Sequence, residues 1–460
     1  MDTYEKTENM SDPKDGFRNQ LLSFSHGISL EWLSHNKESI QSTPELRRLI
    51  ELFPPLEETF RNWRESDQGE FLRTIIHTFQ AQAAFNQVCA ESFPESGLGE
   101  EVIKKVNDLA VSISAFSPAV MPIILWLHDI GRCEDKEKHT EKSAEMISSL
   151  GFLNNKGLLK EEIILIRKVV QYHLLIGTLY TGESSYLSFY PLLKDEEFKF
   201  ILHNHSLIGR FLDSLTLFTI IDVWGYHIND ISPTMIDNYF DIRKEMEGIF
   251  SAKNSAEEIK KRLKERSRRH LDWRLMGYMM AFSKIGKKPH LTRGFYMDMI
   301  LNGYGKYKER EQISFKWDEF KDRCLNKIDQ VQFKYGLGVL IPLSYGGIGE
   351  KMHLNEDTQV NPNLFQLLVC INNRIQEEEG SQQCIPETLW SVVFKGYPPW
   401  NRKTDFHQRL NEPGQIEEIV NRGQVTFDKK EGINTLSIDY RNYWDDLSDY
   451  GEGAWGMESS

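Results

Sequence analysis

An apolar segment that ends in an adjacent histidine and aspartate is the feature that most restricts how this chain can fold. Residues 121–127 read Met-Pro-Ile-Ile-Leu-Trp-Leu, and His128 and Asp129 follow directly. An ionised carboxylate is costly to bury unless it is paired or bound to a metal. Imidazole and carboxylate ligands together suit divalent ions such as Zn, Fe, Mn or Co. The segment therefore favours a buried site at which Asp129 meets a compensating charge.

The length, charge and cysteine usage of the chain limit its class. At 460 residues it has room for about two or three domains. The net charge of −13 argues against a general binder of nucleic acids or anionic membranes, although a local basic patch escapes that average. No two cysteines form a CxxC pair, so we expect reduced thiols and a cytoplasmic protein. The cysteines are Cys89, Cys133, Cys324, Cys370 and Cys384.

The sequence contains no feature typical of a secreted or membrane protein. Residues 1–16 are polar and acidic and lack the apolar core of a signal peptide, so we expect them to be disordered. The longest apolar runs, 119–127 and 215–221, are shorter than the roughly 20 residues of a membrane-spanning helix. We therefore expect a soluble protein without a membrane partner.

Helical periodicity dominates the first 280 residues or so. Apolar residues recur at spacings of three and four, which gives each segment one apolar face. Pro54-Pro55 interrupts the first helical segments, and Ser255 with Glu258 forms a capping box at the start of a later helix. The longer predicted helices cover residues 71–89, 102–116, 138–150, 161–175, 196–228, 233–250 and 255–282.

Beyond residue 314 the pattern becomes mixed. Residues 339–341 and 367–369 could form short strands or buried helical turns, and the pattern does not choose between them. The glycine-rich segment Tyr345–Gly349 lacks the spacing of a phosphate-binding loop. The basic segment 260–270 could contact an anionic substrate such as RNA, but its acidic neighbours favour a solvated helix face.

Histidines and aspartates on the predicted helices form a set of candidate metal ligands. Each member lies on a separate predicted helix or helix end, apart from the adjacent pair. Helices in a bundle can direct such side chains at one internal point. His77 alone would be interpreted as a buried histidine bonded to a backbone carbonyl, but the ordered set is more specific. The candidate ligands are His77, His128, Asp129, His139, His173 and Asp222.

Three further histidines are weaker candidates. His203 and His205 lie two residues apart on a predicted helix, about 200° around its axis, so at most one of them faces the site. We interpret both as structural or partly exposed, with His205 the better candidate. His227 follows Asp222 closely and is a candidate for a position behind the ligands.

Cationic residues follow the His-Asp pair. Arg132 is a candidate phosphate ligand, because a guanidinium group offers a planar fork of donors. A surface arginine after the end of a helix is an equally good interpretation. Lys136 and Lys138 are better explained as part of a solvated charged loop.

The order His, His-Asp, Asp, with further histidines between, resembles that of the HD-domain metal-dependent phosphohydrolases, an all-helical superfamily. The resemblance covers about residues 70–230. Residues 128–132, His-Asp-Ile-Gly-Arg, are similar to the HDxGK/R form of that family. Residues 170–176, Val-Gln-Tyr-His-Leu-Leu-Ile, resemble the His-His-Leu-Leu-Met stretch in HD domains of bacterial uridylyl-removing enzymes, with Tyr172 in place of the first histidine.

The resemblance implies one or two divalent ions per chain, which would be Mn, Fe, Zn, Co or Mg. It implies that the first ion is held by His77, His128, Asp129 and Asp222. It implies that His139 and His173 help to hold the second ion, again with Asp129. Tyr172 removes one further ligand that some family members have at the second ion.

The resemblance also implies a reaction, the hydrolysis of a phosphate ester in a nucleotide or a nucleotidyl-modified protein. Asp129 and Arg132 are the candidate catalytic residues, and a metal would activate the attacking water. The expected partner is a small-molecule phosphate ester or nucleotide. An alternative is a catalytically inactive HD fold that serves as a ligand sensor or protein-interaction module. A third interpretation, RNA binding, depends only on the basic segment 260–270.

The sequence therefore predicts a mostly α-helical protein with an HD-type helical bundle at its centre. A helical extension precedes the bundle, and a mixed, mainly helical region follows it. The predicted segments are a disordered N-terminus at 1–16, a helical extension at 17–69, an HD metallophosphohydrolase domain at 70–232, a C-terminal region at 233–433 and an acidic mobile tail at 434–460.

Overall fold

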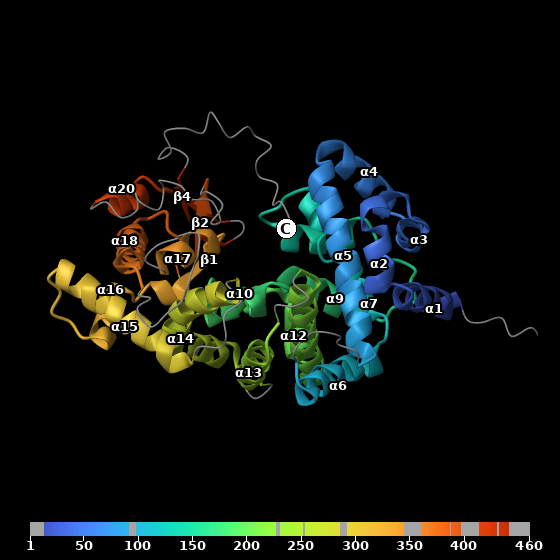
Figure 1. Cartoon of the computed structure of the whole chain (residues 1–460), viewed down its shortest axis with the longest axis horizontal. Coiled ribbons are helices and arrows are strands. Elements are labelled where there is room, and N and C mark those ends of the chain that lie inside the picture. The colour runs from blue at the N-terminus through green and yellow to red at the C-terminus, as the bar shows by residue number, and fades with distance from the viewer. Residues whose placement is uncertain are drawn as a thin grey trace, which may run out of the picture. The chain divides into compact units, whose positions relative to one another are not determined.

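The computed structural model confirms a mostly helical protein (Figure 1). The chain divides into two compact units. Unit 1 comprises Met1–Ile176 and Lys194–Lys253, and unit 2 comprises Gly177–Leu193 and Asn254–Ser460. The structure describes residues 13–91, 98–226, 231–251, 254–285, 292–344, 360–386, 388–396, 414–429 and 432–440.

Unit 1 is helical throughout its described residues, and its longest helices, α5 and α12, lie side by side (Figure 1). Its short 3-10 helices are Lys37–Ser42 and Ile130–Cys133. Its α-helices are α1 (Pro13–His26), α2 (Leu30–Asn36), α3 (Pro44–Leu52), α4 (Leu56–Ser66), α5 (Gln68–Cys89), α6 (Glu100–Phe116), α7 (Val120–Leu127), α8 (His139–Ser149), α9 (Lys160–Tyr172), α11 (Glu196–Leu202), α12 (His205–Tyr226) and α13 (Pro233–Ile249).

A glycine allows α5 and α12 to approach closely. A Cβ atom at Gly225 would lie 3.1 Å from the backbone nitrogen of Ala81, which is tighter than ordinary side-chain packing. One turn away along each helix, Asp222 of α12 meets His77 of α5. The small residues at the helix contact therefore allow two polar side chains to meet inside an apolar bundle.

The predicted helix at 196–228 is two helices in the structure, α11 and α12. The chain leaves helical geometry at Asn204, whose side-chain oxygen accepts hydrogen bonds from the backbone N–H groups of Ser206 and Leu207. Asparagine is among the preferred residues for such a cap, because its side chain satisfies amide groups that a new helix leaves without partners. The apolar periodicity continues across this break, and the sequence pattern alone did not reveal it.

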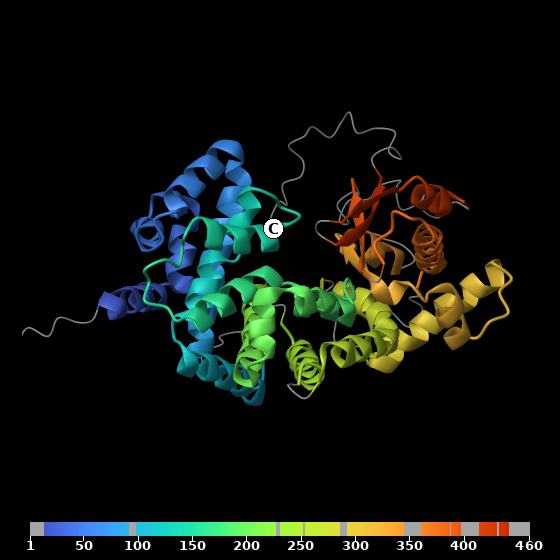
Figure 2. The same ribbon diagram turned by 180° about the vertical axis from the view of Figure 1, so that it is seen from behind.

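Unit 2 combines helices with a four-stranded sheet (Figure 2). The strand order is β1-β2-β4-β3, in which β1, β2 and β4 are parallel and β3 is antiparallel to β4. The strands are β1 (Val331–Lys334), β2 (Trp390–Lys395), β3 (Gln424–Asp428) and β4 (Ile433–Asp439). The α-helices are α14 (Ala256–Ile285), α15 (Arg293–Arg310), α16 (Trp317–Cys324), α17 (Leu337–Ser344), α18 (Pro362–Glu379) and α20 (Gln415–Asn421).

The structure decides several open predictions in this unit. Residues 339–341 lie in α17 and residues 367–369 lie in α18, so both are helical rather than extended. The predicted mobile tail begins inside strand β4, where Leu436 and Ile438 are fully buried, so residues 434–439 were assigned wrongly. Ser255 caps α14 as predicted, since its hydroxyl accepts a hydrogen bond from the N–H of Glu258.

A buried arginine attaches a short segment of the chain to unit 2. Arg274 of α14 is fully buried and donates hydrogen bonds to the carbonyl oxygens of Gly182, Glu183, Ile328 and Val331. Helix α10 (Leu175–Thr181) leads into this segment, and a 3-10 helix, Tyr186–Lys194, leads out of it. The chain therefore leaves unit 1 after α9, contributes residues 177–193 to unit 2 and returns at α11.

These units differ from the predicted segments in two places. Helix α13 packs against α12, so unit 1 extends to Lys253 rather than ending at residue 232. Residues 177–193 belong to unit 2, although they lie within the predicted central domain. Helix α1 begins at Pro13, so the last residues of the predicted disordered N-terminus are helical. Residues 1–12, Tyr345–Gly349, His227 and residues 441–460 lie outside the described residues.

Two stretches of the described chain satisfy the length and composition of a membrane span. The first, Lys160–Thr181, is 61% buried within the structure, as a core helix of a globular protein is. The second is the pair Glu100–Phe116 and Val120–Cys133, which is bent by 104°. Such stretches are weak evidence for a membrane protein, and the burial of the first supports a soluble one.

The basic segment 260–270 forms part of α14 and has two kinds of face. His270 is buried, and the guanidinium of Arg266 lies 4.7 Å from the centre of the Tyr186 ring. On the exposed face, Arg262 forms an ion pair with Glu258 at 2.8 Å. Two of the basic residues of this segment therefore have local roles, since Arg266 packs on an aromatic ring and Arg262 pairs with a carboxylate. RNA binding by this segment stays a prediction.

The buried carboxyl of Asp329 in unit 2 allows a prediction on pH and stability. Only 7% of Asp329 is exposed, and burial raises the pKa of its carboxyl from 3.8 to about 6. A raised carboxyl pKa adds stability that is complete below pH 3.8 and is lost as the pH rises through about 6. Asp329→Asn cannot ionise, so we expect it to be more stable than the wild type at pH 8 by up to about 3 kcal/mol.

The measurement for Asp329 is denaturant unfolding of both proteins between pH 4 and pH 8. The gain in unfolding free energy should shrink toward zero at the acid end, because both side chains are then neutral. Asp298→Asn, which removes an exposed carboxylate from α15 of the same unit, is the matched control and should show no such trend. A gain that is the same at every pH would contradict the prediction.

Candidate metal centre

All six predicted ligands come together inside unit 1. They form two groups, and within each group the potential ligand atoms lie within 4.8 Å of one another. The first group is His77, His128 and Asp222, and the second is Asp129, His139 and His173. His77 lies on α5 and Asp222 on α12. His128 lies at the end of α7 and Asp129 directly follows it, whereas His139 begins α8 and His173 lies at the end of α9.

Asp129 lies between the two groups and faces each of them with a different oxygen. Its Oδ1 atom is 3.4 Å from Nε2 of His139 and 4.0 Å from Nε2 of His173. Its Oδ2 atom is 3.6 Å from Nε2 of His128. In the first group, Oδ1 of Asp222 is 2.8 Å from Nε2 of His77 and 3.7 Å from Nε2 of His128. The two groups therefore adjoin through one carboxylate.

Three of the histidines share one hydrogen-bonding pattern. Nδ1 of His128, His139 and His173 lies 2.8–3.0 Å from the carbonyl oxygen of the residue three positions earlier. A carbonyl only accepts, so Nδ1 carries the proton and Nε2 of a neutral ring keeps its lone pair. Bonds of this kind orient the histidine ligands of metal sites and fix their tautomer.

Several polar atoms at the centre are buried without a hydrogen bond. Among the described residues, Nε2 of His128, Nε2 of His139 and Oδ1 of Asp129 have no hydrogen-bond partner, and all three residues are at least 94% buried. Unsatisfied polar atoms of this kind are rare in folded proteins and call for an explanation such as a bound ion. One of them lies in the first group and two in the second, and such atoms fit bound cations better than a packed core.

The protonation states also suit a cation. Burial lowers the pKa of His128, and it lowers the pKa of His173 to about 3, so both rings are neutral at pH 7. Burial opposes ionisation of Asp129, but His128 and Arg132 hold the pKa of its carboxyl well below the usual range. Burial likewise opposes ionisation of Asp222, yet the hydrogen bond to His77 lowers its pKa. Neutral imidazoles and ionised carboxylates are the forms that bind metals.

An apolar side chain closes one side of the centre. The ring of Phe218 on α12 lies 5.0 Å, centre to centre, from the rings of both His128 and His173. Phe218 is fully buried. An apolar shell of this kind limits the access of water and lowers the local dielectric, which strengthens interactions between ligands and a cation.

Gly131 allows the second group to form. A Cβ atom there would lie 2.4 Å from the backbone nitrogen of Ser143 and 2.5 Å from the carbonyl oxygen of His139. The N–H of Gly131 donates a hydrogen bond to the Ser143 hydroxyl at 2.8 Å. Only glycine fits this approach between position 131, two residues after Asp129, and the start of α8. The approach places His139 beside Asp129.

Gly131→Ala is therefore expected to separate α8 from the His-Asp segment. The added methyl group meets backbone atoms, which cannot rotate away, so we expect a loss of about 1–3 kcal/mol in unfolding free energy. We also expect weaker binding of an ion at Asp129, His139 and His173, measured by metal titration. Gly209→Ala on α12 is the matched control, because no atom lies within 4 Å of its added Cβ. Equal stability and metal binding in the two variants would contradict the role of Gly131.

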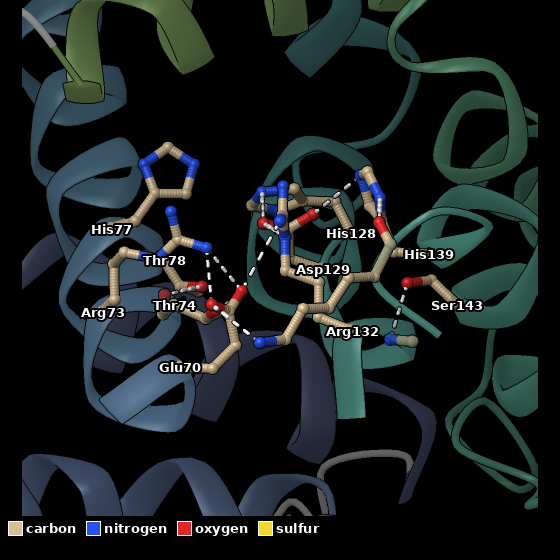
Figure 3. A network of polar contacts seen from close by, with 12 residues as sticks. Glu70, Arg73, Thr74, His77, Thr78, His128, Asp129, Arg132, His139 and Ser143 are labelled. Carbon is tan, nitrogen blue, oxygen red and sulfur yellow. Dashed lines mark hydrogen bonds and ion pairs between the residues drawn. The ribbon is translucent and has the colours of Figure 1, made fainter. Parts of the chain in front are cut away.

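A cluster of charged residues borders the centre (Figure 3). Nε of Arg132 donates to Oδ2 of Asp129 at 2.6 Å, and its NH1 lies 3.5 Å from Glu70. Arg73 donates to both oxygens of Glu70, at 2.6 and 2.5 Å. Nζ of Lys136 lies 3.6 Å from Glu70, and its side chain is 53% exposed, so Lys136 lies in a solvated loop as predicted and also contacts this cluster.

The sequence interpretation did not include Glu70 or the role of Arg73. Both precede His77 on α5 at helical spacing, and Glu70 is only 8% exposed. Residues seven apart lie on one face of a helix, so a carboxylate two turns before a ligand histidine could have been recognised. Its partner Arg132 lies on a distant segment, and the sequence pattern gave no sign of that contact.

The remaining candidates do not join the centre in the described structure. The hydroxyl of Tyr172 bonds to Asp195, so this side chain supplies no ligand. His203 is exposed, with Nδ1 2.6 Å from the carbonyl oxygen of Lys199. The side chain of His205 lies outside the described residues, as does His227.

Comparisons of this chain with protein-family models, curated proteins and solved structures find no significant match.

Proposed function

We propose that this chain is an HD-type metal-dependent phosphohydrolase that acts on a phosphate ester of a nucleotide or of a nucleotidyl-modified protein. The observation that supports it most is the pair of adjoining ligand groups around Asp129. Three of the histidines also present the Nε2 lone pair that a metal requires. This donor set, four imidazoles and two carboxylates, suits Zn, Fe, Mn or Co better than an oxygen-only ion.

In this proposal, His77, His128 and Asp222 hold one ion and His139 and His173 hold the other, with Asp129 contributing to both. Divalent ions so placed would supply a nucleophilic water at neutral pH and would stabilise charge on the phosphoryl group. The Nδ1 bonds of the histidines keep the ligands oriented. Phe218 keeps one side of the centre dry.

In this proposal, the guanidinium groups beside the centre bind the phosphate group of the substrate. Arg132 and Arg73 both have planar donor forks, which match the oxygens of a phosphate group. Arg73 is 41% exposed at its side chain, so it can meet a substrate that approaches from solvent. Glu70 binds both arginines and fixes their separation. These residues bind and orient the substrate in the proposal.

The experiment that tests the function measures metal content and hydrolysis on the same protein. The full chain is purified without chelators or exposure to air, and its metals are determined by elemental analysis. We expect about two equivalents per chain and, with the reconstituted protein, hydrolysis of a nucleotide monoester or diester in a substrate screen. Metal without hydrolysis of any phosphate ester would refute the enzyme and favour the ligand-sensor alternative. No metal after reconstitution would refute the proposed centre itself.

A further inference from the structure

The two oxygens of Asp129 differ in what they contact. Oδ1 has no hydrogen-bond partner and faces His139 and His173. Oδ2 accepts a hydrogen bond from Nε of Arg132 at 2.6 Å, and it is also the oxygen that lies 3.6 Å from Nε2 of His128 (Figure 3). The oxygen available to the first ligand group is therefore the one that a cationic side chain already binds.

Arg132 occupies the position of a cation at Oδ2. A charge-assisted hydrogen bond of 2.6 Å is among the strong ones in proteins. The side chain of Asp129 is 3% exposed and that of Arg132 is 18% exposed, so water screens the pair weakly. An ion that binds Oδ2 would meet this guanidinium directly. Binding of that ion then requires Arg132 to give up its bond to Asp129.

Glu70 offers Arg132 a second carboxylate within reach. Oε1 of Glu70 lies 3.5 Å from NH1 of Arg132, and the Glu70 side chain is only 7% exposed. Arg132 thus lies between two buried carboxylates, with a short bond to Asp129 and a longer contact to Glu70. A small movement of the guanidinium lengthens the first contact and shortens the second, and the charge of Arg132 stays compensated throughout.

We propose that Arg132 is a built-in competitor for the metal centre, and that Glu70 receives it when an ion binds Oδ2 of Asp129. The inference rests on the proposed metal centre. The ion at Asp129, His139 and His173 uses Oδ1 and binds without competition. The ion at His77, His128 and Asp222 must displace Arg132 from Oδ2. The two ions therefore bind with unequal affinity, and the one-ion form is populated at low metal concentration.

Metal titration of the full-length apoprotein tests this competition. Mn²⁺ is titrated into the wild type and its variants, and bound metal is measured by equilibrium dialysis with elemental analysis. The wild type should bind in two separate steps. Arg132→Gln should strengthen the weaker step by about tenfold or more, because an opposing charge and a competing bond are removed. Glu70→Gln should weaken the same step, because Arg132 loses its second carboxylate.

The stronger step provides the internal control. It should change by less than about threefold in each variant, because its oxygen is not the one that Arg132 binds. Arg48→Gln is the matched control variant, since Arg48 lies on α3 of the same unit and forms an exposed ion pair with Glu51. It should leave both steps within about threefold of the wild type. Arg132→Lys keeps the charge but lacks the fork that reaches both carboxylates, and it should strengthen the weaker step if Arg132→Gln does not fold.

Several results would overturn the inference. Equal strengthening of both steps in Arg132→Gln would indicate a general effect of charge. Unchanged binding in that variant, or a single step in the wild type, would contradict competition at Oδ2. Because the readout is metal binding, it separates this inference from the proposed function. Two-step binding without phosphohydrolase activity would refute only the function, and no binding at all would refute both.

Discussion

Asp129→Ala is expected to remove metal from both ligand groups and to abolish phosphohydrolase turnover. Asp129 is the residue that faces both groups, with Oδ1 toward His139 and His173 and Oδ2 toward His128. Loss of a residue that only supports metal ligands costs about 10–100-fold in metal affinity, so loss of a shared ligand should cost more than about 100-fold. Elemental analysis after dialysis and a turnover assay on the same samples measure both effects.

The fold should survive this substitution, which keeps the result interpretable. Arg132 loses its closest partner but keeps its contact to Glu70, so its charge is not left alone in the protein. Asp237→Ala is the control, because Asp237 forms an exposed ion pair with Lys105 and lies on α13 away from the ligand groups. Full metal content and full activity in Asp129→Ala would show that the assignment of Asp129 is wrong.

The sequence predicted the ligand set because the relevant signals are local. A carboxylate in or just after an apolar helix can be recognised without any knowledge of the fold. Asp222 lies within α12, and Asp129 lies just after the end of α7. Apolar periodicity gave the helices that carry these residues, and the helix limits differ from the prediction by only a few residues at α5 and α9. A bundle then has few ways to bury so many polar groups other than at one point.

The network around Glu70 depends on contacts that no local pattern contains. Arg132 lies 62 positions beyond Glu70 in the sequence, and the contact exists only because α5 and the segment after Asp129 pack side by side. The contact of the exposed Lys136 with Glu70 is absent from the sequence pattern for the same reason. A charged residue in a polar loop has the same local pattern whether it is solvated or paired with a buried carboxylate.

The sheet of unit 2 was missed for a different physical reason. Strand β1 has four residues, and five of the six residues of β2 are buried. A strand buried on both faces shows no alternation of apolar and polar residues, so its pattern matches that of a short buried helix. Strand β4 does alternate, but it lies next to an acidic stretch whose composition dominated the prediction of a mobile tail.

Arg274→Met is expected to destabilise unit 2 by about 3–5 kcal/mol, a range typical for removing one member of a buried polar network. The methionine fits the volume but cannot donate to the carbonyls of Glu183, Ile328 and Val331, which Arg274 now satisfies. Each lost hydrogen bond from the charged guanidinium removes about 1.5–3 kcal/mol before the structure relaxes. Gly182, Glu183 and Ile328 each keep one other donor, because the Tyr278 hydroxyl, the Phe333 N–H and the Val331 N–H also donate to their carbonyl oxygens.

Hydrogen exchange followed by mass spectrometry shows which segments Arg274→Met destabilises, whereas a melting temperature reports only the overall loss of stability. Arg274 joins residues 182 and 183 to the start of β1, so amide protection should fall in peptides that cover residues 177–193 and 328–334. Peptides from α5 should keep their protection, because that helix belongs to unit 1. Arg269→Met, an exposed change on the same helix, is the control and should leave all of these peptides unchanged. Protection that persists in residues 177–193 of Arg274→Met would mean that apolar packing alone holds this segment in unit 2. The buried arginine would then not be the reason that the chain between α9 and α11 belongs to unit 2.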